Sequence, residues 1–579
     1  MMASPTTSRR GGWLGRYFPI WAWLPAYQRS WLGLDVIAGL TVWVLVIPEA
    51  VAYAQIAGVP PQVVLAAAPV ALLAYALFGT SRQVVVGSTS SIAILTAAII
   101  APMAAGGSER YIALAADLAI LVGALFVLSS LLRLGFVSAF LSRSVVTGFL
   151  FGLALVIAIG QVGKLFGIKT GSGSGDFFME LWNFITHLGE TNGWTLLIGV
   201  LSLAILFGLP RVFPRIPAAL VALVFGIAFV SLFNMEQRGV AIVGAIPGGF
   251  PQLKIPAIGL SDLLALLPGA LGLTLVAYSE HTGATSASAT RHHYDTDANQ
   301  ELIAVGIANL GAGLFQGFAV GGSLSRSTAN DTAGSRSQIS SLVASALVLL
   351  TAIALTPLFY NLPQATLGAI VIRAVIGLMD VGVLKHFYRL RTAAFVQALT
   401  AMLGVLTLGV LPGLLIAVAL SLLILIYQAS RPSVALLGKV PGKQAYGDIE
   451  QYPENEAIPG LLLLRPDVQF FFANTTQFRN RVRDLLRTTD PSPRSVLIDL
   501  QATARLDIDS LEMLTELHTE LKAKDIELLL ASVRAPVRDM LQRSGLADTI
   551  GKQHIYLSVE EGVRAFQEGS RQESKKEEF

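Results

Sequence analysis

The sequence predicts an α-helical polytopic membrane protein that carries a small α/β domain at its C-terminal end. The chain has 579 residues, of which 53% are hydrophobic and only 14% are charged, far from the balance of a soluble globular protein. Between about residues 31 and 428, apolar stretches near 20 residues long follow one another, as crossing a bilayer requires. The remaining C-terminal part has the charge content of a soluble domain.

The apolar stretches form two sets of about seven, some of them too short to be full spans. The first set covers residues 34–56, 62–79, 84–103, 111–132, 136–163, 194–210 and 215–234. The second set covers residues 262–288, 299–318, 324–335, 338–361, 364–380, 393–410 and 412–428. We therefore expect about 14 segments in a transport domain at 34–430, built from repeats at about 34–234 and 262–430.

Positive charges predict which loops face the cytoplasm, because Lys and Arg accumulate on that side. They are Arg133, Arg143, Arg211, Arg215, Arg291, Lys385, Arg389, Arg391 and Arg431. These residues follow even-numbered segments, so both termini are predicted to be cytoplasmic. Residues 1–33 are rich in Arg and Trp and carry no acid, which suits a cytoplasmic arm at the membrane interface. A multi-pass protein of the cell (plasma) inner membrane is expected.

A faint internal repeat supports this topology. The run Val85-Val86-Gly87-Ser88-Thr89-Ser90 matches Val320-Gly321-Gly322-Ser323-Leu324-Ser325 in the pattern V-x-G-S-x-S, in the third segment of each half. Seven is an odd number, so two tandem copies must insert with opposite orientation, as in many secondary transporters. Each copy reads as a short β-prone run that breaks a helix near mid-membrane.

The pattern changes after Arg431-Pro432 to short strands that alternate with helices. Residues 431–455 are expected to be a linker, 456–567 a small α/β domain with a mixed sheet, and 568–579 a disordered charged tail.

Several kinds of chemistry are excluded or disfavoured by composition. The chain has no cysteine, so it forms no disulfide and has no thiol nucleophile. A net charge of +3 is too small to suggest nucleic-acid binding. No phosphate-binding loop, HExxH motif or nucleophile elbow is present, and His292-His293 lacks the spacing of a metal site. We expect no cofactor, no metal and no enzymatic activity.

The two motif copies are the candidate substrate site. A half-helix that begins inside the membrane points its free N–H groups and positive dipole end at whatever lies before it, which favours an anion. The candidate ligands are Ser88, Thr89, Ser90, Ser323, Leu324 through its N–H, and Ser325. The alternative is that these small residues only satisfy helix backbone or allow close helix packing.

Charged residues near these motifs extend the site. Arg326 follows the second motif, and an arginine in an apolar bundle must face a cavity, an acid or an anionic ligand. Its alternative role is as structural partner of an acid such as Glu280. Glu280 and Glu49 are intramembrane acids and candidate proton carriers, with a fixed salt bridge or helix hydrogen bond as the alternative for each. Proton symport would reduce the charge moved when a divalent anion enters.

These residues resemble the SulP family of sulfate permeases and related anion transporters, with its C-terminal STAS domain. The resemblance covers nearly the whole chain and rests on residues 47–54 (IPEAVAYA), 79–82 (GTSR) ahead of 86–88 (VGS), 297–302 (DANQEL), 323–327 (SLSRS) and 431–432 (RP). It implies core and gate domains, a 7+7 inverted repeat, elevator-like transport and a homodimer in membrane lipid.

The resemblance also implies roles for single residues. It places the anion between the third and tenth segments, adds Tyr53 of the first motif to the substrate-binding residues, and assigns proton coupling to an acid where Glu280 lies. Many members have glutamine after the first-segment proline, whereas this chain has Glu49. Bicarbonate carriers often lack an arginine at position 326, so Arg326 favours sulfate. In the STAS-like domain, Ser510 is a candidate regulatory residue. The interpretation that we prefer is that Ser510 simply occupies the first turn of a helix.

The leading hypothesis is therefore proton-coupled sulfate symport. A sodium-coupled bicarbonate symporter, an anion exchanger and a dicarboxylate transporter remain alternatives within transport. The alternative from another functional class is a membrane-anchored STAS signalling protein that senses an anion.

Overall fold

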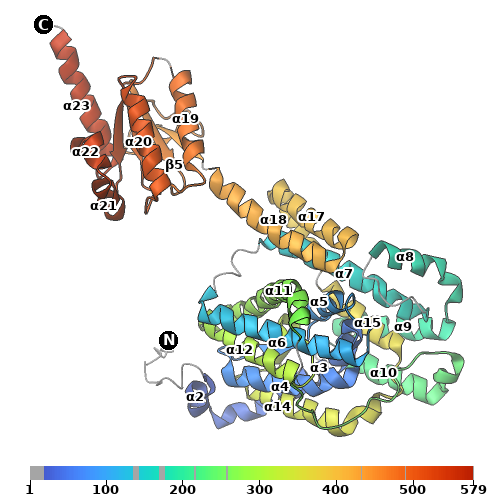
Figure 1. Cartoon of the computed structure of the whole chain (residues 1–579). Coiled ribbons are helices and arrows are strands. Elements are labelled where there is room, and N and C mark those ends of the chain that lie inside the picture. Colours follow the sequence, from blue (N-terminus) through green and yellow to red (C-terminus); the bar gives the residue numbers. More distant parts are fainter. Residues whose placement is uncertain are drawn as a thin grey trace. The chain divides into compact units, whose positions relative to one another are not determined.

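The computed structural model divides the chain into two compact units, 1–421 and 422–579 (Figure 1). It describes residues 18–134, 142–168, 177–213, 217–255, 259–377, 379–431, 433–489 and 491–577. Most of the predicted N-terminal arm, with Arg9, Arg10 and Arg16, lies outside these ranges, as do Arg215 and Pro432.

The first unit is a helical membrane bundle. Among the described residues, eight helices are long and apolar enough to cross a membrane: Arg29–Ala57, Pro61–Phe78, Glu109–Leu131, Arg143–Phe166, Gly193–Val212, Leu260–His292, Ile339–Phe359 and Gln364–Leu390. Four shorter apolar helices join them: Ser90–Ile100, Ala218–Phe233, Thr392–Leu408 and Leu415–Ser430. The fold class predicted from the sequence is confirmed.

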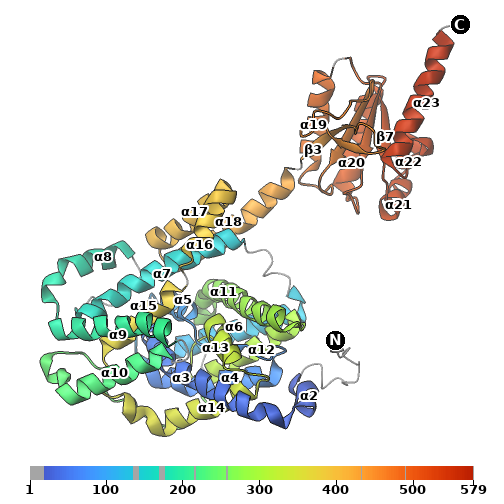
Figure 2. The same ribbon diagram turned by 180° about the vertical axis from the view of Figure 1, so that it is seen from behind.

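One group of helices, here called the core helices, packs around α12. They are α3 (Leu32–Ala57), α4 (Pro61–Phe78), α5 (Ser90–Ile100), α6 (Glu109–Leu131), α11 (Leu260–His292), α12 (Ala298–Leu314), α13 (Leu324–Thr332) and α14 (Ile339–Leu350). Helix α12 contacts α4 and α6, while α14 contacts α3 and α4 (Figure 2). Helices from both sequence halves therefore interleave in this group.

A second group, here called the gate helices, packs around α7 and α15. They are α7 (Arg143–Phe166), α9 (Gly193–Val212), α10 (Ala218–Phe233), α15 (Gln364–Ile376) and α17 (Thr392–Leu408). Helix α3 is the core element that contacts both α10 and α15. The first unit also contains α2 (Ile20–Trp23), α8 (Phe177–Thr186), α16 (Val381–Leu390) and most of α18 (Val410–Ser430).

The two V-x-G-S-x-S copies meet at the centre of the core helices. Strand β1 (Val85–Gly87) and strand β2 (Gly321–Ser323) pair antiparallel, with Val86 opposite Gly322. Each strand is followed by a short helix, α5 after β1 and α13 after β2. Because the strands are antiparallel, the two helices leave opposite ends of the sheet and turn their N-terminal ends toward the same region.

The second unit is built on a five-stranded mixed sheet with the order β4-β3-β5-β6-β7. Its strands are β3 (Val434–Lys439), β4 (Tyr446–Asp448), β5 (Leu461–Pro466), β6 (Ser495–Asp499) and β7 (Glu527–Ala531). Strands β5, β6 and β7 are parallel, and β3 is antiparallel to β4 and β5. Its helices are α19 (Thr475–Thr488), α20 (Ile508–Lys522), α21 (Ala535–Arg543), α22 (Leu546–Ile550) and α23 (Val559–Glu577).

Alternating side chains give this sheet two apolar faces. Leu462 and Leu464 belong to the cluster that α19, α20, α21 and α22 complete, whereas Leu461 and Leu463 belong to the cluster completed by α23. This period of two is the expected pattern of a strand that is covered on both sides.

Three boundaries of the second unit differ from the sequence prediction. The supposed linker 431–455 contains β3 and β4, which complete the sheet. Residues 470–472 are apolar enough for the sequence to predict a strand, but they lie in the loop and turn before α19, and Phe470 is buried in the core cluster instead of pairing in the sheet. Helix α23 continues to Glu577, past the predicted start of the disordered tail, because its Glu, Gln, Lys and Arg residues favour helix.

Candidate functional site

Both half-helices begin with a hydroxyl cap. Thr89 precedes α5 and its side chain accepts the N–H of Ile92 at 3.4 Å. Ser323 precedes α13 and accepts the N–H of Arg326 at 3.4 Å. A capping hydroxyl satisfies one of the free N–H groups of a first turn and leaves the others available. The site therefore has two positive helix ends that come from opposite halves of the sequence.

Arg326 joins the two halves. Its Nη2 donates to the carbonyl oxygen of Ser88 at 2.6 Å, so a residue of α13 holds the backbone that follows β1. A Cβ at Gly87 would lie 3.1 Å from Nη1, so the guanidinium lies directly against this glycine. Its Nε is buried and has no hydrogen-bond partner among the described residues. The guanidinium thus retains donor capacity inside the core.

The acid that pairs with Arg326 is Glu49, whose Oε2 lies 3.7 Å from Nε. Glu49 follows Pro48 inside α3 and is largely buried. Tyr53, one turn further along α3, interacts electrostatically with Glu49, Arg326 and Glu280. The sequence predicts Glu280 as the alternative partner of Arg326, and in the structure Glu49 takes that place.

Glu280 on α11 is bound by the start of α5. Its Oε2 accepts from the hydroxyl of Thr89 at 3.1 Å, and its Oε1 accepts from the hydroxyl of Ser91. The first motif predicts Thr89 as a site residue but not Ser91, which directly follows the motif. A serine one residue into the helix points back toward a neighbouring helix, a direction that the motif alone does not reveal.

The remaining predicted ligands lie around the same two helix starts. Ser88 and Ser90 are buried, and Ser90 is the first residue of α5. Leu324 opens α13 and its side chain is exposed, so only its backbone faces the site. Ser325 is exposed and its hydroxyl lies 3.2 Å from that of Ser323. Ten residues predicted to bind substrate or protons thus gather in one region: Tyr53, Ser88, Thr89, Ser90, Ser323, Leu324, Ser325, Arg326, Glu49 and Glu280.

Ser510 lies in the second unit. It is in the first turn of α20, fully buried, and its hydroxyl donates to Oδ1 of Asp507, the N-cap of that helix. Asp507 also accepts the N–H groups of Ser510 at 2.9 Å and Phe472 at 2.8 Å. Burial alone would raise the pKa of Asp507, but these hydrogen bonds outweigh it and hold the pKa below its ordinary value.

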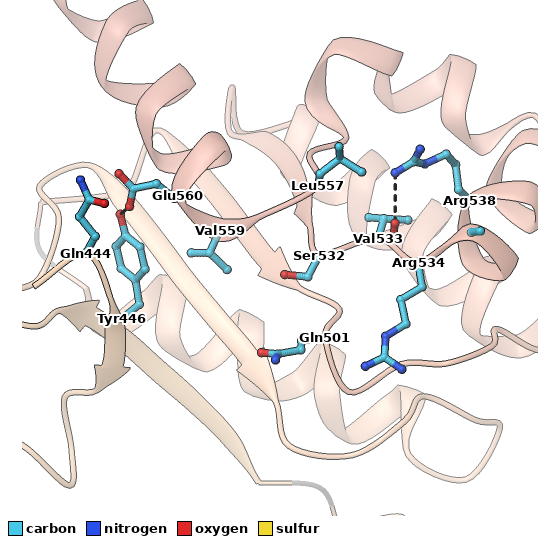
Figure 3. A pocket seen from close by; sticks show the side chains of 11 residues that line it. Gln444, Tyr446, Gln501, Ser532, Val533, Arg534, Arg538, Leu557, Val559 and Glu560 are labelled. Atoms are coloured by element: carbon cyan, nitrogen blue, oxygen red, sulfur yellow. Dashed lines mark hydrogen bonds between the residues drawn. The ribbon is translucent and has the colours of Figure 1, made fainter.

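The second unit also has a cavity of about 710 Å³ (Figure 3). It opens where β7 ends and α21 begins, and Ser532, Arg534 and Arg538 from this connection line it. Arg538 donates to the carbonyl oxygen of Val533 at 3.2 Å. At the opposite wall, Tyr446 donates to Glu560 at 2.9 Å, and burial together with this bond raises the pKa of Tyr446 to about 12. A hydrogen bond between β4 and α23 therefore holds this wall of the cavity.

Comparison with protein families identifies both units. The model of the sulfate permease family matches residues 32–426, and that of the STAS domain matches residues 452–562. Within the described residues, no group of three or more His, Cys, Asp or Glu side chains is arranged to hold a metal ion.

Curated relatives align over almost the whole chain. A probable sulfate transporter of Mycobacterium tuberculosis is 38% identical over 543 residues, covering 93% of this chain and 96% of the relative. Sulfate transporter 4.1, a chloroplastic protein of Arabidopsis thaliana, is 31% identical and covers 95% of this chain and 83% of the relative.

Solved structures with the same fold include the murine Slc26a9 anion transporter in its inward-facing state. It has a TM-score of 0.88 at 23% identity, covering 98% of this chain and 97% of that one. The transmembrane domain of the cyanobacterial bicarbonate transporter BicA aligns with a TM-score of 0.59 at 22% identity, covering 69% of this chain and 98% of that domain. The chain belongs to the sulfate permease family, a family of membrane anion transporters, and carries a C-terminal STAS domain.

Proposed function

We propose that this protein is a proton-coupled sulfate symporter that binds its anion between the starts of α5 and α13. The observation that carries the proposal is the guanidinium of Arg326. Its Nε is buried, forms no hydrogen bond with any residue that the structure describes, and lies at two helix starts that favour negative charge. Arginine matches the oxygen geometry of an oxyanion better than a point charge does. The names of the curated relatives support sulfate as that oxyanion.

The coupling residues in this proposal are Glu280 and Glu49. Glu280 receives hydrogen bonds from Thr89 and Ser91 at the start of α5, and Glu49 lies beside Arg326. A proton carried on either acid offsets one negative charge of the anion. Each charge moved across a membrane potential of 100 mV costs about 2.3 kcal/mol, so such compensation favours uptake of a divalent anion.

Transport proceeds in this proposal by an elevator-type movement of the core helices against the gate helices. Most close packing is within each group, and α3 makes the main contacts between them. A polar contact between the groups is the hydrogen bond that Nζ of Lys164 on α7 donates to Gln55 on α3 at 3.3 Å. An apolar recess of about 350 Å³ lies between α3 and α10, with Pro48 and Leu223 in its wall. The apolar wall of this recess is a surface along which one group can slide past the other.

The proposal also includes the cellular setting expected from the sequence. The protein is a homodimer in the lipid of the plasma (inner) membrane, with both termini in the cytoplasm. Arg133 and Arg143 lie at the end of α6 and the start of α7, and Arg211 lies in the last turn of α9, on the side assigned to the cytoplasm.

The test is uptake of radiolabelled sulfate into liposomes that contain the purified protein, with and without an inward proton gradient. Gradient-driven uptake that is lost in Glu280→Gln is the expected result. The matched control is Glu109→Gln, which neutralises an exposed acid in the first turn of α6. Sulfate uptake without gradient dependence contradicts proton coupling. Absence of sulfate uptake contradicts the assignment of the anion, and bicarbonate with sodium, counter-anions and dicarboxylates are then tested. Anion binding without any flux would favour a sensor.

A further inference from the structure

The Asp297–Leu302 motif carries side chains that the proposed anion site does not use. Asp297 caps α12 and accepts the N–H groups of Asn299 at 2.9 Å and Gln300 at 3.1 Å. The side chain of Gln300 donates to the carbonyl oxygen of Phe78 at 2.9 Å, at the end of α4. These contacts start one helix and attach it to another. Glu301, by contrast, is turned into the protein and is only 3% exposed.

The carboxylate of Glu301 accepts hydrogen bonds from several donors. Its Oε1 accepts the N–H of Thr80 at 2.7 Å, the hydroxyl of Thr80 at 2.5 Å and the N–H of Ser81 at 3.2 Å. Its Oε2 accepts the hydroxyl of Tyr75 at 2.8 Å and pairs with Nε2 of His281 at 2.6 Å. A carboxylate has about four lone-pair sites, so the acceptor capacity of this one is used completely.

These donors belong to the two parts of the chain that form the anion site. Thr80 and Ser81 lie in the segment that leads into β1. His281 directly follows Glu280 on α11. The imidazole also lies against β2, because a Cβ at Gly322 would be 2.5 Å from Nδ1 and 3.0 Å from the Cα of His281. The Glu301–His281 pair therefore lies between the approach to β1 and the middle of β2.

His281 also determines how α11 is rotated. Adjacent residues of an α-helix point about 100° apart, because a turn contains 3.6 residues. With the ring of His281 held by Glu301 and stacked edge-on against Tyr75 at 5.5 Å, Glu280 must point to a different side. That side is the start of α5, where Thr89 and Ser91 bind it. Among the described residues, Glu301 forms no hydrogen bond with Glu280, Thr89 or Ser91, so it acts through His281 and Thr80.

We propose that Glu301 is a positioning residue that fixes both half-helix breaks and the rotation of α11, and so delivers Glu280 to Thr89 and Ser91. The proposal rests on the proposed function for the role of Glu280 in coupling, but its geometric content does not depend on which anion is carried. The buried carboxylate of Glu301 is the shared acceptor for several donors, so removing it leaves those buried donors unpaired. Replacing Glu301 therefore releases His281 and with it the orientation of Glu280.

The absence of cysteine allows a direct test of this geometry in the full-length protein. Ser91→Cys places a thiol at a side chain that is 1% exposed beneath Glu280, and its alkylation rate by a maleimide is measured. Adding Glu301→Gln is expected to raise this rate at least tenfold. Adding Gln300→Ala, which removes a hydrogen bond from the same turn of α12, is expected to leave it unchanged.

A second thiol separates repositioning from general loosening. Ser202→Cys lies on the gate helix α9, where Ser202 is fully buried beside Thr366. The thiol at position 202 is expected to stay protected from the maleimide when Glu301→Gln is added. Two outcomes overturn the proposal: continued protection of the thiol at 91, or simultaneous labelling of both thiols, which would make Glu301 only a general stabiliser.

The transport readout is the pH dependence of uptake of whichever anion the wild type carries. Glu301→Gln and His281→Gln are each expected to shift the pH of half-maximal rate, and the double variant is expected to resemble the single ones because both act in one chain of contacts. Additive shifts, or an unchanged pH profile, overturn the proposal. Failure of sulfate uptake by the wild type contradicts the proposed function alone, since the labelling experiment still decides the positioning role.

Discussion

Arg326 and Glu49 face each other across 3.7 Å, and they come from opposite halves of the sequence. The cation that the proposed mechanism assigns to the substrate thus has a counter-charge inside the protein. A buried pair of opposite charges is tolerated, whereas a single unpaired buried charge is strongly disfavoured. An entering anion and the carboxylate of Glu49 therefore compete for the same guanidinium.

Glu49→Gln is expected to strengthen sulfate binding at neutral pH, because it removes this competitor and keeps the shape of the side chain. We expect the apparent KM for sulfate to fall severalfold, with up to tenfold corresponding to about 1.4 kcal/mol. Uptake at pH 5.5 and pH 7.5 measures it, and the pH dependence of KM should become flatter. A KM that rises, or that changes equally in Glu109→Gln, contradicts the competition.

Arg326→Gln is expected to abolish uptake, and Arg326→Lys to reduce it more than tenfold, because lysine lacks the planar fork that reaches both Ser88 and an oxyanion. Arg326→Gln also leaves Glu49 as an unpaired buried charge, which destabilises proteins by roughly 3–5 kcal/mol. Adding Glu49→Gln should restore the Tm but not transport. Restored transport in the double variant would show that Arg326 has only a structural role.

Gly87→Ala is expected to raise the KM severalfold without loss of expression. The new methyl group would lie 3.1 Å from Nη1 of Arg326, closer than side chains normally approach, so the guanidinium must move. The control is Gly283→Ala on α11, where a Cβ meets nothing within 4 Å and alanine favours helix. Sulfate uptake kinetics of both variants measure the effect. Equal kinetics for the two variants would mean that the position of Arg326 near Gly87 is unimportant.

The sequence predicts the membrane bundle well because hydrophobic length depends on local composition. The two V-x-G-S-x-S breaks are predictable for a similar reason, since Gly and hydroxyl residues interrupt two apolar runs at equivalent places. That the two copies pair as β1 and β2 is visible only in the structure. Arg326 is recognisable because an arginine in an apolar segment needs a partner. Its actual partner, Glu49, is not predictable without the packing of α3 against α13.

Other features depend on contacts between distant segments and leave little local signal. In the sequence, Ser91 looks like any other helix residue. Its role is evident only because α11 places Glu280 against it. Glu301 and His281 are 20 positions apart in the sequence, and Thr80, which also binds Glu301, is 221 positions away from it. Strands β3 and β4 are short, and they become recognisable only when β5 pairs with β3. Strand propensity within a short window of sequence cannot reveal pairings between distant segments.

Ser510→Ala is expected to destabilise the STAS domain by about 1 kcal/mol, because it removes a donor to the N-cap of α20. Ser510→Asp should destabilise it more, since a second carboxylate would face Asp507. Hydrogen–deuterium exchange of residues 500–520 in the full-length chain measures both effects. The pKa of Asp507 is held low, so its stabilising contribution is present above the ordinary Asp pKa and is lost as pH falls through the lowered value. Unchanged exchange in Ser510→Asp would show that a charge, and hence a phosphate, is tolerated at this site.

His518 predicts a second pH effect, on the opposite kind of group. Both ring nitrogens are buried and find no hydrogen-bond partner in the described part of the chain. Burial, aided by the nearby charges of Lys522 and His554, lowers the pKa of His518. The unfolded chain takes up a proton near pH 6.5, whereas the folded domain resists protonation until lower pH. Stability of the STAS domain is therefore expected to fall as pH drops from about 6.5 toward the lowered pKa.

Hydrogen–deuterium exchange of β6 and β7 in the full-length chain, at pH 7.5 and pH 5.0 after correction for the intrinsic exchange rate, measures this effect. His518→Gln removes the titrating group and should reduce the difference between the two pH values, because glutamine has no proton to gain in this range. The effect of His518 is separable from that of Asp507, which acts only below the ordinary Asp pKa. If the wild type and His518→Gln lose protection equally between these pH values, His518 does not carry the pH dependence, and a group that both proteins share must do so.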